Sequence, residues 1–131
     1  MNASEIFKCL ADPQRLRLVN LLEEGPLCVC HLQTLLKAPQ VKISKQLAYI
    51  KALGIAVAER QGTWMIYRLA MPAPELLITN LKSLRALNDP TARQLQEDSW
   101  SRKELLKKLA GQKSTCPENL FNALCCHKKL P

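Results

Sequence analysis

The chain has 131 residues, of which 47% are hydrophobic and 23% are charged. This composition excludes wholesale disorder and predicts one folded domain. The formal net charge of +8 favours an anionic partner, and nucleic acid is the commonest such partner for a small basic protein. No apolar run approaches the roughly 18 residues that a membrane span needs, and the amphipathic N-terminal segment is unlike a signal peptide. We therefore expect a cytoplasmic protein with no membrane partner.

The first part of the chain predicts three short helices. Apolar residues recur at helical spacing through residues 3–24, interrupted by "ADP", where Asp12 is a typical N-cap and Pro13 suits the first position of a helix. The break "EGP" at residues 24–26 precedes "CVCHLQTLLK", whose leucines lie on one face of a third helix. Two cysteines therefore fall in the first turn of that helix.

A fourth helix is predicted to have one apolar and one basic face. Ile43, Leu47 and Ile50 recur at i, i+4 and i+7, while lysines, a glutamine and a tyrosine occupy the opposite face. Gly54 is a typical end for this helix. The pattern indicates one face for the protein core and one for a polyanion.

Two β-prone runs follow, at residues 55–59 and 63–69. They flank "RQG" and predict a β-hairpin whose turn uses Gly62. Helix, turn, helix and hairpin, in that order, are typical of a winged helix-turn-helix domain.

Two further helices are expected after the hairpin. A leucine stripe continues after "MPAP", and Asp89 with Pro90 begins another helix that ends at Gly111. The fold class that we predict is mostly α with a small β-hairpin. Residues 1–111 would form the winged helix-turn-helix domain, and residues 112–131 a tail that contains cysteines.

Positive charge is concentrated in residues 37–68, which contain six lysines and arginines against one acidic residue, Glu59, and so carry five of the eight net positive charges. Such cations neutralise phosphates, while polar side chains on a recognition helix reach base edges in the major groove. A solvated charged face is the alternative, but the short helix before it and the basic hairpin after it favour DNA binding. The residues expected to contact DNA are Gln40, Lys42, Ser44, Lys45, Gln46, Tyr49 and Arg60.

Cys28 and Cys30 are candidate ligands of a soft ion. Thiols at a helix N-terminus have lowered pKa values, and thiolates bind thiophilic ions. In a regular helix the side chains at i and i+2 point about 200° apart, so chelation of one ion would distort the first turn and disturb the recognition helix that follows. Two small buried residues at a packed helix start are the alternative explanation.

Three collinear segments resemble the ArsR/SmtB family of metal-sensing repressors, specifically arsenical-operon repressors: "FKCLADPQRLRLVNLLEEGPLCVCHL", "PQVKISKQLAYIKALG" and "RQGTWMIYRL". The resemblance implies a homodimer, joined through its first and last helices, that represses an arsenic-resistance operon and needs no cofactor to bind DNA. It also implies release from DNA when trivalent arsenic or antimony binds Cys28 and Cys30. A two-fold dimer would bind an inverted-repeat operator. Since no catalytic constellation is found, we expect no enzymatic activity.

Two positions depart from the pattern of that family. Three-thiolate repressors of this kind carry a third cysteine three residues after the second, where this chain has Gln33. The thiols that could replace it are Cys9, Cys116, Cys125 and Cys126. His31 stands where an acidic residue is usual and leaves a Cys-Cys-His site for zinc or cadmium open, although a lone histidine on a short helix is more often a surface residue. A cadmium-, lead- or thiol-redox-responsive repressor of the same fold is therefore the alternative function.

Overall fold

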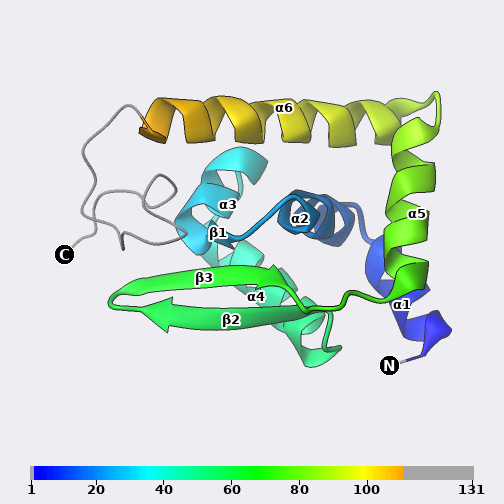
Figure 1. The fold of residues 1–131 in the computed structure, drawn as a ribbon, viewed down its shortest axis with the longest axis horizontal. Coiled ribbons are helices and arrows are strands. Elements are labelled where there is room, and N and C mark those ends of the chain that lie inside the picture. Colours follow the sequence, from blue (N-terminus) through cyan, green and yellow to red (C-terminus); the bar gives the residue numbers. More distant parts are fainter. Residues whose placement is uncertain (1, 111–131) are drawn as a thin grey trace.

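The computed structural model describes residues 2–110 of the chain (Figure 1). In chain order its elements are α1 (Ala3–Ala11), α2 (Pro13–Glu23), β1 (Leu27–Cys28), α3 (Val29–Leu36), α4 (Gln40–Ala52), β2 (Ala56–Gln61), β3 (Trp64–Leu69), α5 (Glu75–Ala86) and α6 (Pro90–Ala110). The prediction of a mostly helical domain with a small hairpin is confirmed. The predicted tail, residues 112–131, lies outside the described residues.

The helices begin where the sequence places their caps. The Asp12 carboxylate accepts a hydrogen bond of 3.0 Å from the Arg15 backbone N–H at the start of α2, and the Asp89 carboxylate accepts one of 3.0 Å from the Ala92 N–H at the start of α6. Each N-cap is followed by a proline, which loses no intrahelical hydrogen bond at that position. These local signals fix two helix starts without help from the rest of the fold.

The sheet has three antiparallel strands in the order β1-β3-β2. The predicted hairpin is β2 and β3, in which Gln61 pairs with Trp64, and Gly62 in the turn has a φ of 64°, a conformation that glycine adopts without strain. The two-residue strand β1 was not predicted. Its Leu27 pairs with Tyr67 and its Cys28 with Ile66. The segment before α3 is therefore paired with the β2–β3 hairpin, which is the wing of the domain.

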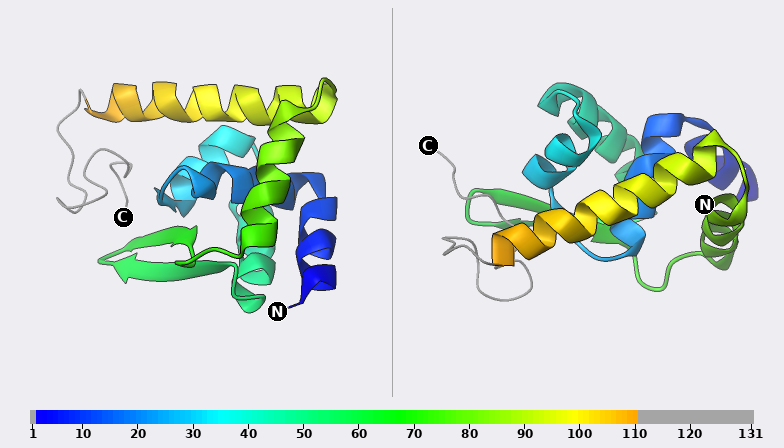
Figure 2. Two further views of the ribbon diagram at one scale, coloured as in Figure 1. Left: turned by 45° about the vertical axis from the view of Figure 1, so that its right-hand side comes forward. Right: turned by 90° about the horizontal axis from the view of Figure 1, so that it is seen from above.

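The core lies between the sheet and the helices. The predicted apolar face of α4 is confirmed, because Ile43, Leu47 and Ile50 are fully buried. In Figures 1 and 2, α6 lies along one side of the domain and the β2–β3 wing on the opposite side, with α2 and α3 between them. Within residues 2–110, no helix combines the length and the apolar character that crossing a membrane requires.

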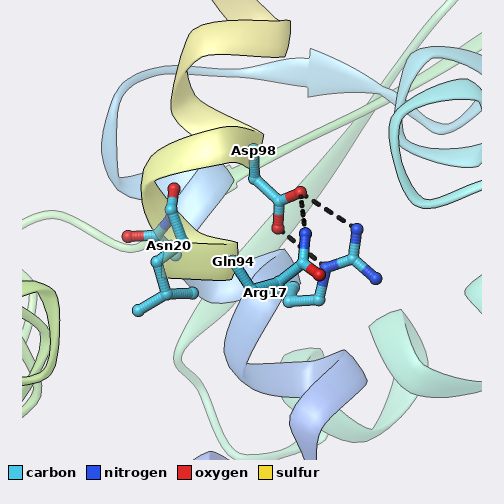
Figure 3. A network of polar contacts seen from close by, with 5 residues as sticks. Arg17, Asn20, Gln94 and Asp98 are labelled. Atoms are coloured by element: carbon cyan, nitrogen blue, oxygen red, sulfur yellow. Dashed lines mark hydrogen bonds and ion pairs between the residues drawn. The ribbon is translucent and has the colours of Figure 1, made fainter. Parts of the chain in front are cut away.

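A buried polar network joins α2 to α6 (Figure 3). The Asp98 carboxylate accepts hydrogen bonds of 2.7 and 2.9 Å from the guanidinium of Arg17 and one of 3.0 Å from Gln94. Hydrogen bonding with Asp98 raises the pKa of Arg17. Asn20 extends the network, since its side chain donates to the carbonyl of Leu95 at 3.3 Å. The network fixes α6 in register against α2.

Beyond Asp98 on α6, two contacts reach the segment that leads into β1. Ser99 donates a hydrogen bond to Glu24, and the buried Arg102 donates one of 3.4 Å to the carbonyl oxygen of Pro26. Burial lowers the pKa of Arg102. A Cβ atom on Gly25 would lie 2.9 Å from Nη2 of Arg102, so this close approach requires glycine. The long helix therefore supports the backbone just before Cys28.

Candidate metal centre and nucleic-acid interface

The two candidate thiols lie at the junction of β1 and α3. Cys28 is the last residue of β1 and the N-cap of α3, with an extended backbone (φ −83°, ψ 157°), whereas Cys30 lies within the first turn of the helix. The prediction that both are helical is therefore wrong for Cys28. Because the chain changes from strand to helix between them, the two side chains need not diverge, and their sulfur atoms lie within 4.8 Å of each other.

His31 belongs to the same group of donor atoms. One ring nitrogen of His31 and the sulfurs of Cys28 and Cys30 all lie within 4.8 Å of one another. The expectation of a surface histidine is wrong, because the side chain is only 3% exposed. The eight-residue helix α3 is in contact with α2, α4, α6 and β3, so few of its positions reach solvent.

The environment of Cys28 favours a thiolate. Hydrogen bonding with Cys30 lowers the pKa of Cys28 most, burial opposes it, and the hydrogen bonding and charge of His31 lower it further, to about 4. The sequence predicted this direction from the helix N-terminus, but the neighbouring thiol is the main cause. Cys28 therefore supplies a thiolate at neutral pH, which is the form that binds soft ions.

Among the described residues, Cys9 does not join this cluster. Within the described part of the chain, Cys28, Cys30 and His31 are the group of three donors that could hold a metal ion. Cys9 is fully buried in α1, and burial raises its pKa, so it is a poor ligand. Gln33 is half-buried on α3. Cys116, Cys125 and Cys126 lie outside the described residues.

The predicted DNA-contacting residues divide into two groups. An exposed group lies on α4 and on the wing, and consists of Gln40, Lys42, Ser44, Lys45 and Arg60. The six basic side chains of residues 37–68 are all exposed. Since Lys42 and Lys45 lie on the solvent side of a helix whose apolar face is buried, α4 presents positive charge to a partner.

Gln46 and Tyr49 form the second group and are held by α2. The Gln46 amide donates to Asp12 at 3.0 Å and accepts from Arg15 at 3.2 Å. The Arg15 guanidinium also lies 3.9 Å from the centre of the Tyr49 ring. The role of Arg15 was not predicted, because nothing in the sequence indicates that its side chain reaches α4. These contacts fix α4 on α2, so both residues have a packing role.

Comparisons with known proteins identify the family of this chain. The model of the bacterial regulatory proteins of the arsR family matches residues 12–57. An HTH-type transcriptional regulator of Methanocaldococcus jannaschii is 47% identical over 66 residues, which are 50% of this chain and 74% of the relative. The chain belongs to the ArsR family.

Two relatives of this ArsR-family protein are connected with arsenic by name. The arsenic resistance transcriptional regulator ArsR1 of Pseudomonas putida is 42% identical over 80 residues (60% of this chain and 62% of the relative). The arsenical resistance operon repressor of Escherichia coli K12 is 46% identical over 71 residues (53% and 61%). The chain thus spans about three fifths of the length of these two relatives. A repressor named SmtB from Mycobacterium tuberculosis (40%) and a CadC homologue from Staphylococcus aureus (33%) also match.

Solved structures support the same fold. The transcriptional repressor BigR of Xylella fastidiosa superposes with a TM-score of 0.59 at 27% identity, covering 66% of this chain and 85% of that one. A homodimeric winged helix-turn-helix DNA-binding domain from Mycobacterium bovis has a TM-score of 0.53 at 27% identity, covering 63% and 73%. The predicted winged helix-turn-helix fold is therefore confirmed for this ArsR-family protein.

Proposed function

We propose that this protein is an arsenic-responsive transcriptional repressor. It binds an inverted-repeat operator as a homodimer and leaves the DNA when trivalent arsenic or antimony binds the thiolates of Cys28 and Cys30. The observation that carries the proposal is the pair of sulfurs at the β1–α3 junction, one of them favoured as a thiolate by its neighbours, at the start of the helix that directly precedes the recognition helix α4. The protein senses and binds rather than catalyses, and it acts where operator DNA is found, in the cytoplasm.

The DNA-bound state relies on α4 and the wing. Lys42 and Lys45 on α4 and Arg60 near the tip of the hairpin are exposed and would neutralise phosphates, while Gln40 and Ser44 at the start of α4 reach base edges. Arg15 and Asp12 hold Gln46 and thereby keep α4 at a fixed angle on α2. A rigid helix in a defined position is what major-groove recognition needs.

Release follows from where the thiols are attached. Cys28 pairs with Ile66 of the wing strand β3, and α3, which carries Cys30, packs against α4. An ion that draws the two sulfurs together moves β1 against the wing and α3 against the recognition helix. To change DNA occupancy from 99:1 to 1:99, the ion must favour the released conformation by about 5.5 kcal/mol. Bonds from thiolates to a soft ion can supply that difference.

Dimerisation is supported by exposed apolar side chains on the first and last helices. Phe7 on α1 is 51% exposed and Trp100 on α6 is 64% exposed, so each of these helices has a large aromatic side chain that a second copy of the chain could bury. The relative from Mycobacterium bovis is a homodimer. A two-fold dimer would place its two recognition helices in half-sites about 10 base pairs apart or a multiple of that.

A second candidate is a cadmium- or lead-responsive, or thiol-redox-responsive, repressor of the same fold. The matches to SmtB and to the CadC homologue favour it, since those names do not refer to arsenic. The DNA-binding part is common to both candidates, so they differ only in the ligand.

The test uses reduced full-length protein and a fluorescent operator selected with that protein from a random DNA library. Arsenite is titrated while anisotropy reports DNA binding by the wild type, a Cys28→Ser/Cys30→Ser variant, and a Cys125→Ser/Cys126→Ser variant that tests whether the tail thiols contribute. We expect arsenite to release the wild type, and the Cys28→Ser/Cys30→Ser variant to stay bound. Equal release of that variant would refute the assignment of the site. No release of the wild type would refute arsenic sensing and leave cadmium, lead or oxidation as the signal.

A further inference from the structure

The thiol pair supplies two donors, whereas a stable three-coordinate site needs a third. Within residues 2–110 no third cysteine lies near Cys28 and Cys30. The neighbouring His31 is only 3% exposed, and within the described residues its ring has no polar partner apart from the thiols beside it. Buried polar groups are rarely left without partners. The imidazole is therefore available as a donor to an ion that the thiols bind.

The distances are close to those of a metal site. In a tetrahedral site with Zn–S bonds of about 2.3 Å, two sulfur donors lie about 3.8 Å apart. The donor atoms of Cys28, Cys30 and His31 lie within 4.8 Å of one another, so a movement of about 1 Å would bring them to bonding distance of one ion. Cys30 is half-buried while Cys28 and His31 are buried, so an ion would reach the site from the Cys30 side.

We infer that His31 is the third donor of a Cys28–Cys30–His31 site for a divalent d10 cation, Cd²⁺ or Zn²⁺, with the fourth coordination position left to water. Two thiolates and one imidazole are a mixed soft and borderline donor set, which suits zinc and cadmium. The inference goes beyond the proposed function, with which it shares the two thiols. All three ligands come from one four-residue segment of one chain, so the site is complete without the thiols of the tail.

The direct test is spectroscopic and uses Cd²⁺ alone, without DNA. Reduced full-length protein is labelled with ¹⁵N in its two histidines, His31 and His127, and is titrated with ¹¹³Cd²⁺. We expect one ring nitrogen of His31 to shift and to show coupling to ¹¹³Cd as the cadmium–thiolate absorption appears, while His127 serves as the internal control. Absorption that saturates with the His31 nitrogens unchanged would overturn the inference, and so would the absence of any binding.

Matched variants measure how much the imidazole contributes. His31→Asn and His127→Asn make the same change at the two histidines. We expect His31→Asn to weaken Cd²⁺ binding by roughly 100-fold or more, because even loss of a group that only orients a ligand costs 10–100-fold, and His127→Asn to bind as the wild type does. Equal binding by the two variants would contradict the inference. Because the wild-type spectra need no variant, a His31→Asn protein that fails to fold does not remove the test.

The test of Cd²⁺ binding by His31 does not depend on whether the protein responds to arsenic. Cation binding is measured without DNA and without arsenite, whereas the proposed function is measured as release from the operator. If His31 binds Cd²⁺ but arsenite does not release DNA, the site stands and the arsenic proposal fails. If arsenite releases DNA but His31 does not bind Cd²⁺, the arsenic proposal stands and the third donor is not His31.

Discussion

The ion pair between Arg17 and Asp98 allows a quantitative prediction about how α6 is held. The substitution is Asp98→Ala. The Asp98 side chain is 5% exposed and accepts three hydrogen bonds, two of them from the guanidinium of Arg17. Alanine removes the acceptor and leaves the charge of Arg17 half-buried without its carboxylate.

Breaking a buried, hydrogen-bonded ion pair costs about 3–5 kcal/mol. The Arg17 side chain is 25% exposed, so water replaces part of the lost interaction, and we expect a loss of about 2–3 kcal/mol. The matched control is Glu104→Ala, which breaks the exposed pair with Lys107, whose N–O distance is 3.7 Å. That pair is worth under about 0.5 kcal/mol.

Urea unfolding followed by circular dichroism measures the free energy of unfolding, at one fixed protein concentration because dimerisation adds to stability. The double variant Arg17→Ala/Asp98→Ala should lose less than the sum of the two single variants by about 1 kcal/mol or more. Strictly additive losses, or a loss for Asp98→Ala as small as that of the control, would refute the view that this contact holds α6 on α2.

Two further predictions concern the site and the DNA interface. The pKa of Cys28 is lowered to about 4, so Cys28 should be charged at neutral pH, and any stability that this charge contributes should be lost as the pH falls towards 4. The Cβ chemical shift of ¹³C-labelled cysteine, followed against pH, reports the ionisation of the thiol directly. A neutral Cys28 thiol at pH 7 would contradict the prediction. Lys45→Ala should weaken operator binding, reduce the slope of log K for DNA binding against log salt concentration by about 1, and leave the free energy of unfolding unchanged. Gln46→Ala loses the hydrogen bonds to Asp12 and Arg15 and should lower the free energy of unfolding by about 1 kcal/mol. Urea unfolding and anisotropy at several salt concentrations separate the two variants, and the same stability for both would show that Gln46 is not held by α2.

The elements that the sequence predicts correctly are those set by local signals. Asp12 and Asp89 each precede a proline, and the cap is decided by a few neighbouring residues. The spacing of Ile43, Leu47 and Ile50 identifies the buried face of α4, because an amphipathic helix turns its apolar stripe towards the core. The hairpin follows from β-prone runs on either side of Gly62.

The features that escaped the sequence depend on contacts across the fold. β1 has two residues and exists because Leu27 and Cys28 pair with β3 almost 40 positions later, so no periodicity could indicate it. The burial of His31 results from the helices and the strand around α3. Gln46 lies on the polar face of α4, and only the position of Arg15 on another helix shows that its amide is occupied. The sequence therefore located the two thiols and left His31 open as a third donor, but only the fold shows that His31 is buried beside them.

The short strand β1 has a consequence for engineering. Cys28 uses its side chain as a candidate ligand and its backbone as a strand partner of Ile66. A graft of residues 28–31 onto another winged regulator would transfer the donor atoms but not the β1–β3 strand pairing. Only a transplant that includes Leu27 and the opposing stretch around Tyr67 would keep the recipient's wing mechanically connected to the new sensor. Libraries of chimeric sensors built in this way should exchange strand partners together with the thiols.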